Sequence, residues 1–225
     1  MDESFEKLLA ELEQFGQTND KSVSDRPRRM LNITRGTGEF LSVLVRATGA
    51  RRVLEIGTSN GYSTLWLASA ASSVGGTVTT VELSGFKVDL AAKNFARSGL
   101  APVIVQVQDD AGHALSRHRD AAFDMIFLDS ERPEYPGWWP DIKRVLRPGG
   151  LLVADNATSH AEQMAPFVAL VKADAGFVTS LVPVGNGEFL ATRVSRSIDA
   201  AANIGIPVRM SATRPYGRGS VTRKG

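Results

Sequence analysis

Two carboxylates and one amide stand at the ends of two short apolar runs. Asp129 follows FDMIFL at 123–128, and Asp155 and Asn156 close LLVADN at 151–156. If the two runs are neighbouring parallel strands, about 4.8 Å apart, the three side chains can converge on one point. Carboxylate and amide oxygens favour Mg²⁺, with Mn²⁺ or Ca²⁺ as substitutes. Either acid alone is more often a helix cap, but the pair at adjacent strand ends favours a metal site.

A glycine loop follows an earlier apolar run, RVLEI at 52–56. Gly57 and Gly61 stand in this loop, directly before a helical pattern. Glycine lets the backbone approach a ligand closely, and the N-terminus of a helix offers free N–H groups. Glu82 ends the next apolar run, 21 residues after Gly61, where a carboxylate can accept both hydroxyls of a ribose. The loop and the acid together predict a site for a nucleoside-bearing ligand, and the alternative is a plain turn with a surface Glu.

The residues around the loop separate two kinds of nucleoside ligand. A dinucleotide fingerprint needs Gly-x-Gly-x-x-Gly, and Ser59 occupies the second glycine position. Close packing against a pyrophosphate is therefore not provided for. Glu55, just before Gly57, also suits a cationic ligand better than a diphosphate. A NAD-dependent oxidoreductase is accordingly the weaker interpretation.

A sheet must position these residues, and the order of apolar runs and helical patterns predicts one. Their alternation is typical of βαβ units, and continuous apolar runs suit strands covered on both faces. Two later runs, FVTSLVPV and EFLATRV, are joined through Gly185-Asn186-Gly187, which permits only antiparallel pairing. We expect an α/β fold with a Rossmann-like, doubly wound sheet of about seven strands, five parallel plus a C-terminal antiparallel hairpin, with helices on both faces. The five expected parallel strands span 52–56, 77–83, 103–107, 123–128 and 151–155, and the expected helices span 3–15, 37–47, 61–71, 86–98, 111–118, 135–146 and 161–174.

Length and composition suit one globular domain. The chain has 225 residues, of which 43% are hydrophobic and 22% charged, as in ordinary soluble proteins. We expect a single domain over 1–194, with an N-terminal helical lid at 1–48 and the Rossmann-like core at 50–194. Residues 195–225 carry six Lys and Arg residues against one Asp and show no apolar periodicity. They are predicted to form a basic, disordered tail.

Composition also excludes several classes of protein. No apolar run approaches the roughly 18 residues that a membrane span needs, and the acidic, amphipathic N-terminus is unlike a signal peptide. A cytoplasmic protein without membrane contact is therefore expected. Cysteine is absent, which excludes a disulfide framework and a thiolate nucleophile.

The stretch VLEIGTSNGYSTLWLA at 53–68 makes a family resemblance specific. It resembles the first motif of class I S-adenosylmethionine-dependent methyltransferases, in particular the cation-dependent O-methyltransferases of the catechol and caffeoyl-CoA type. The similarity extends over roughly residues 30–194. It implies that Gly57 and Gly61 line the cofactor and that Ser63 holds its methionine carboxylate.

Further cofactor positions follow from the same resemblance. Glu82 would hold the ribose, and Glu55 would lie near the amino group of the cofactor. Asn32-Ile33-Thr34 matches an upstream stretch of the family whose backbone, here at Ile33, also meets the methionine end. Asp110-Ala111 resembles the Gly-Asp-Ala turn beside adenine, with Asp109 in place of the glycine.

The metal hypothesis agrees with the resemblance. FLDSERPEY and LLVADN stand where the family has Phe-Ile-Asp-Ala-Asp-Lys-x-x-Tyr and Val-Ala-Asp-Asn, so Asp129, Asp155 and Asn156 take the metal positions. Methyl transfer from a sulfonium needs an oxyanion, and a phenol with a pKa of about 10 is only about one part in a thousand ionised at pH 7. Ligation to a divalent cation lowers that pKa, and chelation of two neighbouring hydroxyls orients one of them for attack.

Arg132 departs from the family pattern. It takes the position of a lysine that is often assigned as the general base, a role closed to arginine because its pKa lies above 12. Arg132 could instead stabilise a developing phenolate or grip a substrate carboxylate or phosphate. The alternative is a surface arginine paired with Glu131 or Glu134. Glu131 takes the family's second acidic position.

Three more side chains are candidates for the acceptor site. Tyr135 and Trp138 begin the helix after Arg132 and could wall a flat aromatic acceptor, although aromatics at helix spacing often pack in a core. His160, four residues after Asn156, could act as a base or as an extra ligand, although a histidine at a helix start is more often neither.

The resulting hypothesis is a Mg²⁺-assisted, S-adenosylmethionine-dependent O-methyltransferase. It would methylate a hydroxyl of a small aromatic acceptor, catechol-like or hydroxycinnamoyl, with Asp129 and Arg132 as catalytic residues, and it would form a homodimer. One alternative is a methyltransferase for a hydroxylated base in tRNA or another RNA, which the basic tail favours and the acidic body disfavours. Another is a cofactor-binding protein in which Arg132 has impaired catalysis.

Overall fold

The computed structural model describes residues 3–195. Residues 196–225 lie outside the described part, and with them almost all of the basic segment predicted to be disordered. The RNA alternative drew its support from that segment. None of the helices within residues 3–195 is both long enough and apolar enough to cross a membrane.

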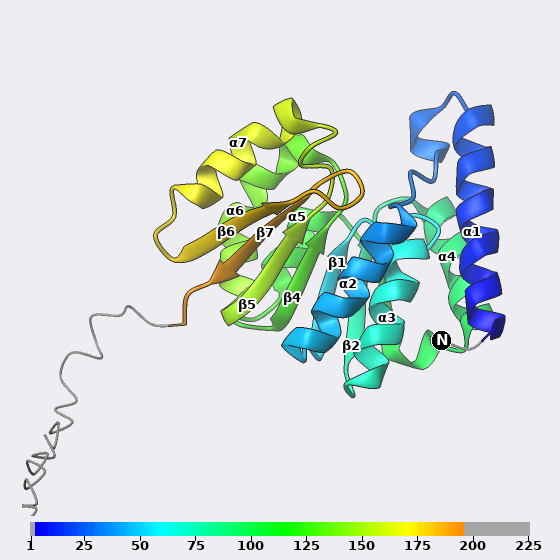
Figure 1. Ribbon diagram of the computed structural model, residues 1–225, viewed down its shortest axis with the longest axis horizontal. Coiled ribbons are helices and arrows are strands. Elements are labelled where there is room, and N and C mark those ends of the chain that lie inside the picture. Colours follow the sequence, from blue (N-terminus) through cyan, green and yellow to red (C-terminus); the bar gives the residue numbers. More distant parts are fainter. Residues whose placement is uncertain (1–2, 196–225) are drawn as a thin grey trace, which may run out of the picture. The chain divides into compact units, whose positions relative to one another are not determined.

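The described chain is built around a seven-stranded sheet in the order β3-β2-β1-β4-β5-β7-β6 (Figure 1). The first five strands pair in parallel, and β7 pairs antiparallel with both β5 and β6. The predicted α/β fold, with five parallel strands and a C-terminal hairpin, is thereby confirmed. The strands are β1 (Arg52–Ile56), β2 (Thr77–Glu82), β3 (Ile104–Gln108), β4 (Phe123–Leu128), β5 (Leu146–Ala154), β6 (Phe177–Val182) and β7 (Glu188–Arg193).

Helices cover both faces of the sheet. On one face lie α2 (Arg35–Thr48), α3 (Tyr62–Ser73) and α4 (Gly85–Ser98), and α1 (Glu3–Ser22) packs on α3 and α4 from outside. On the other face lie α5 (Ala111–Arg117), α6 (Tyr135–Val145) and α7 (Ala161–Lys172). Three 3-10 turns complete the order: η1 (Arg26–Arg28), η2 (Ala101–Val103) and η3 (Arg132–Glu134). Side chains alternate along each strand, so Val53 faces the first group of helices and Leu54 the second.

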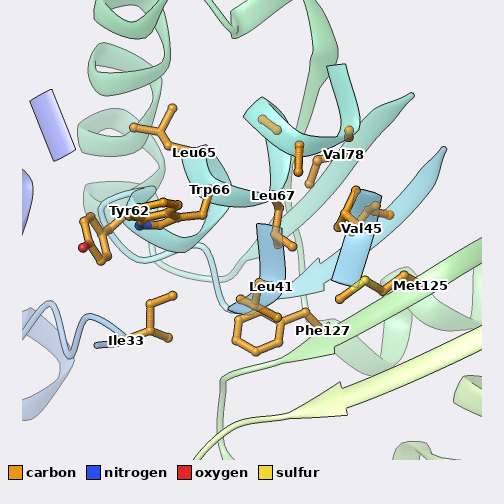
Figure 2. Close-up of a cluster of buried hydrophobic side chains, with 14 of the residues drawn as sticks. Ile33, Leu41, Val45, Tyr62, Leu65, Trp66, Leu67, Val78, Met125 and Phe127 are labelled. Atoms are coloured by element: carbon orange, nitrogen blue, oxygen red, sulfur yellow. The ribbon is translucent and has the colours of Figure 1, made fainter. Parts of the chain in front are cut away.

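The core on the first face is drawn in Figure 2. Trp66 and Leu67 of α3, Leu41 of α2 and Phe127 of β4 are fully buried in one cluster, with Leu41 beside the Phe127 ring. Burying one such side chain stabilises the fold by roughly 1.5–3 kcal/mol. This packing fixes α3 on the sheet, and α3 begins directly after the glycine loop.

Two elements differ from the sequence-based expectation. Helix α1 was predicted to end at residue 15 but continues through a polar stretch to Ser22. In its last turn the carboxylate of Asp20 accepts the backbone N–H groups of Met30 at 2.7 Å and of Leu31 at 2.9 Å. Strand β5 begins at Leu146 instead of 151, because β4 pairs with both sides of the Arg147–Gly150 turn across a register shift. The first difference positions a segment of the functional site.

Candidate active site

A cavity of about 960 Å³ opens at the carboxyl ends of the parallel strands. Its walls come from the loops that follow β1, β2, β4 and β5, and from the segment 26–33 between α1 and α2. Loops at this edge of a doubly wound sheet are where such folds bind ligands. The N-terminal segment therefore contributes one wall, as the predicted lid would.

The glycine loop brings β1 against the start of the β4 loop. Gly57 has φ 105°, and a Cβ at this position would lie 2.0 Å from the carbonyl oxygen of Asp129. Only glycine permits this approach. The loop is also tied to the N-terminal segment, since the hydroxyl of Ser59 donates to the carbonyl oxygen of Met30 at 2.6 Å. Gly57 therefore brings the predicted cofactor loop and the predicted metal acid onto one cavity wall.

Glu82 is fixed at the end of β2 by two backbone hydrogen bonds. One carboxylate oxygen accepts the N–H of Ser59 at 2.9 Å, and the other accepts the N–H of Ser84 at 3.0 Å. The side chain lines the cavity. Each carboxylate oxygen keeps a further lone pair for a ligand hydroxyl, as a ribose-binding acid requires.

Glu55 lies beneath the cavity and does not line it. Its carboxylate is fully buried and accepts hydroxyl hydrogen bonds from Ser63 at 2.6 Å, from Thr80 at 2.6 Å and from Thr64. Burial raises the pKa of Glu55 to about 7, against the lowering effect of the hydroxyl donors. The structure therefore gives Glu55 a supporting position, in which it orients Ser63, and Ser63 itself lines the cavity.

The remaining cofactor candidates also divide into residues that line the cavity and one that does not. Ile33, Asp110 and Ala111 line the cavity, and Asp110 caps α5 by accepting the N–H of His113 at 3.0 Å. Gly61 does not line it. With φ 88° it forms the N-cap of α3, where it turns the chain into the helix.

Asp129, Asp155 and Asn156 meet at the cavity, as the strand order requires. The amide Nδ2 of Asn156 donates to Oδ1 of Asp129 at 3.1 Å, and the backbone N–H of Asn156 donates to Oδ1 of Asp155 at 2.6 Å. Asn156 has φ 68°, a left-handed conformation that occurs at functional turns. Burial first, and then the charge of Asp155, raise the pKa of Asp129 well above its ordinary value.

A third acid in this neighbourhood was missed by the sequence analysis. Glu188, the first residue of β7, is fully buried, and its Oε1 accepts the hydroxyl of Thr37 at 3.1 Å. Its Oε2 is buried and accepts from no donor of the described chain, but the Asp155 carboxyl is close enough to share a hydrogen bond with Glu188 when one of the two acids is protonated. Burial and the nearby Asp155 raise the pKa of Glu188 to about 9. A charged residue directly after the Gly185–Gly187 turn was the signal available in the sequence.

Arg132 contradicts the surface-pair interpretation. Its side chain is only 6% exposed, it lines the cavity, and its Nε donates to Oε1 of Gln163 in α7 at 2.8 Å. Glu131 instead forms an exposed ion pair with Arg26, in which Oε1 of Glu131 lies 3.9 Å from Nη2 of Arg26. Within residues 3–195, no carboxylate lies within ion-pair distance of Arg132.

The aromatic candidates are separated by the structure. Trp138 lines the cavity and is half-buried, whereas Tyr135 is fully buried and lies outside the lining. The Tyr135 hydroxyl accepts the backbone N–H of Ser130 at 2.7 Å, so this residue supports the β4 loop, and the expectation that it touches an acceptor is wrong. Burial raises the pKa of Tyr135 far above its ordinary value. His160 lines the cavity and is exposed.

Comparison with known proteins places these features in a family. Residues 4–194 match the family described as O-methyltransferase. A putative O-methyltransferase of Mycobacterium avium is 32% identical over 174 residues, which cover 72% of this chain and 78% of the relative. A catechol O-methyltransferase of Niastella koreensis is 34% identical over 141 residues, which cover 60% of this chain and 62% of the relative.

Solved structures show the same similarity. An O-methyltransferase from Bacillus cereus in complex with S-adenosylhomocysteine superposes with a TM-score of 0.70 at 26% identity, covering 86% of this chain and 91% of that one. An O-methyltransferase from Streptomyces achromogenes, involved in tomaymycin synthesis and in complex with S-adenosylmethionine, gives 0.69 at 28% identity with the same coverage. These likenesses extend over nearly all of the described chain.

Proposed function

Since the chain belongs to the O-methyltransferase family and is a methyltransferase, we propose that it transfers a methyl group from S-adenosylmethionine to a hydroxyl of a small aromatic acceptor, catechol-like or hydroxycinnamoyl, with the help of a divalent metal ion. One observation carries the proposal. The glycine loop, Glu82 and the pair Asp129 and Asp155 line a single cavity. The residues suited to a nucleoside and the residues suited to a metal ion therefore share one cavity.

The cofactor half of the cavity suits a nucleoside joined to an amino acid. Glu82 presents a fixed carboxylate for the ribose hydroxyls, and the exposed start of α5 at Asp110 and Ala111 suits the base. Ser63 stands at the first turn of α3, where helix N–H groups favour a carboxylate. The hydrogen bond from Ser63 to Glu55 sets the direction of that hydroxyl.

The donor set of the other half fits a divalent cation. Asp129, which is partly buried, and Asp155, which is buried, are mutually repelling acids at neighbouring strand ends, an arrangement that a hard cation stabilises. The Asn156 amide, turned about its terminal bond, would present Oδ1 beside them. A bound Mg²⁺ would supply a lowered pKa to a ligated hydroxyl and a fixed orientation for two neighbouring hydroxyls.

The residues of the chain assign the other roles. Arg132 cannot accept a proton, so its guanidinium stabilises negative charge beside Asp129. Trp138 offers an aromatic surface to the acceptor from the start of α6. His160 lies at the mouth as a candidate acceptor contact. The cytoplasm and a homodimer are the expected setting.

A methyl-transfer assay with and without EDTA tests the proposal. Catechol, caffeate and caffeoyl-CoA are incubated with labelled S-adenosylmethionine and Mg²⁺, using wild type, Asp155→Ala and Asp89→Ala, the last an exposed acid of α4 outside the cavity. We expect EDTA and Asp155→Ala each to abolish transfer, and Asp89→Ala to retain it. Full activity in EDTA would refute the metal role. Calorimetric binding of NAD in preference to S-adenosylmethionine would refute the cofactor.

A further inference from the structure

We propose that the acceptor carries an acidic group, a carboxylate or a phosphate, close to the reacting hydroxyl, and that Arg132 binds this group. The inference rests on the proposed function and narrows its substrate class. It comes from the state of one buried guanidinium and from the charges on the wall around it.

Arg132 is a buried cation with unused donors. Its side chain is 6% exposed, and Nε is occupied by Gln163 at 2.8 Å. The two terminal nitrogens make no hydrogen bond or ion pair with any residue of 3–195. Removing a guanidinium from water is costly unless an anion or several acceptors compensate it. Asp129 and Asp155 supply opposite charge to Arg132 without a direct ion pair, and the two terminal nitrogens are left open to a bound anion.

Other arginines of the fold show the contrast. Arg52 and Arg147 both bond the carboxylate of Asp124, and Arg144 bonds Asp141 together with backbone carbonyls. These three guanidiniums have their charges paired, although they are more exposed than Arg132. Arg132, the most buried of the four, is the one in which both terminal nitrogens are free.

The bond to Gln163 directs the free donors. Because a guanidinium is planar, the bond from Nε to Gln163 of α7 fixes the plane, and the two terminal nitrogens form a fork at the far end of that plane. Arg132 lines the cavity, and so the fork is available to a ligand there. Parallel donors of this kind match the two oxygens of a carboxylate or phosphate. A neutral hydroxyl would occupy one donor and leave the charge uncompensated.

One neighbour adds positive charge to this part of the wall. Arg26 lines the same cavity, and both Arg132 and Arg26 act, after burial, to lower the pKa of His160, which also lines it. Glu131 and Glu134 line the cavity as well but are exposed, and Glu131 meets Arg26 only at 3.9 Å. Such an exposed pair is worth little. Asp129 and Asp155 are the lining acids that the proposed cation would neutralise, which leaves Arg132 and Arg26 as the cations on this side.

The position of Arg132 limits where the acidic group lies on the acceptor. Arg132 follows Asp129 by three residues, and both line the cavity. A group bound to Arg132 is consequently near the hydroxyl that Asp129 helps to place. Dihydroxybenzoates and dihydroxyphenyl phosphates fit this description, whereas cationic catecholamines are disfavoured.

A matched acceptor panel tests the inference. Methyl transfer and calorimetric binding, the latter with S-adenosylhomocysteine and Mg²⁺, are measured for 2,3- and 3,4-dihydroxybenzoate, the corresponding benzamides, a dihydroxyphenyl phosphate and catechol. We expect wild type to prefer an acid over its amide by about 10- to 100-fold, the effect of a charge-assisted hydrogen bond. Preference for the phosphate over both benzoates would identify the acidic group as phosphate, and the reverse as carboxylate.

Three variants separate a specific role of Arg132 from a structural one. Arg132→Gln should remove the acid-over-amide preference in binding while catechol binding changes less than threefold. Arg132→Lys, which keeps the charge without the fork, should retain part of the preference. Arg28→Gln, an arginine of η1 that stacks on Phe86 and does not line the cavity, should behave as wild type. Thermal unfolding of each variant checks that it is folded.

The outcomes distinguish a failure of the anion site at Arg132 from a failure of the proposed methyltransferase function. Equal use of acid and amide by wild type, or an unchanged preference in Arg132→Gln, overturns the anion site while catechol methylation leaves the proposed function intact. If no acceptor is methylated and S-adenosylhomocysteine does not bind, the proposed function fails and the inference with it.

Discussion

Glu55 should make the free energy of unfolding depend on pH, and Glu55→Gln should remove that dependence. The carboxyl is fully buried under the glycine loop, between hydroxyls of α3 and β2. Burial raises its pKa from 4.5 to about 7. The unfolded chain, in which Glu55 is in water, titrates at the ordinary value.

The sign and size follow from this difference. Below pH 4.5 both states are protonated at Glu55, and the full contribution to stability is present. As the pH rises, the unfolded state loses its proton first, so stability falls until the folded state also ionises near pH 7. A difference of about 2.5 pKa units at 1.36 kcal/mol each gives a loss of about 3 kcal/mol. Water does not screen the charge of this carboxylate, because the side chain is wholly inaccessible to solvent.

Urea unfolding at pH 5 and pH 8 measures this effect. Other titrating groups are common to wild type and variant, so the difference between the two proteins isolates Glu55. Relative to wild type, Glu55→Gln should gain about 2.5 kcal/mol between pH 5 and pH 8, since the unfolded state is already partly ionised at pH 5. Glu162→Gln, which removes an exposed acid of α7, is the control and should track wild type at both pH values. If the difference in free energy of unfolding between wild type and Glu55→Gln were the same at both pH values, the reasoning would be refuted.

Three further predictions follow. Gly57→Ala should lower the free energy of unfolding by at least about 2 kcal/mol in urea titrations, because its Cβ would overlap the Asp129 carbonyl at a φ unsuited to alanine. Glu82→Gln should weaken calorimetric binding of S-adenosylhomocysteine about tenfold, since a carboxylate acceptor is lost; unchanged affinity would remove Glu82 from the ribose site. Although burial opposes it, bonds from Arg52 and Arg147 lower the pKa of Asp124 from 3.8 to about 2. The stability that Asp124 contributes is therefore present above pH 3.8 and lost as the pH falls towards 2, so the advantage of wild type over Asp124→Asn should shrink across that window in acid unfolding.

The fold was predictable because its signals are local. Strand β1 is a short apolar run covered on both faces, and the turn Gly185–Gly187 permits only a hairpin. The end of α1 was not predictable in this way. Its last turns are polar, and they stay helical where Asp20 accepts the backbone of the 30–31 segment, a contact made only in the tertiary structure.

The site was predictable where topology alone decides it. Asp129 and Asp155 end neighbouring strands, and Gly57 and Glu82 occupy positions that a βαβ unit brings to the same edge. Depth below the surface was not available from the sequence. Glu55 faces the first group of helices, so it lies under the cavity floor. Tyr135 begins α6 as expected but turns into the core.

Glu188 and Arg132 were the least predictable, because a buried charge depends on partners distant in the sequence. Together with Asp129 and Asp155 they determine the charge that a ligand meets. Burial and the charge of Asp155 raise the pKa of Glu188 to about 9, and a divalent cation bound to Asp155 would lower that pKa again by neutralising the charge. In the proposed site Asp129 and Asp155 would balance the cation, and the guanidinium of Arg132 would stand beside it as a further positive charge. An ionised catechol oxygen would supply its negative charge to the cation, whereas an acidic group on the acceptor would supply a further negative charge to the free donors of Arg132.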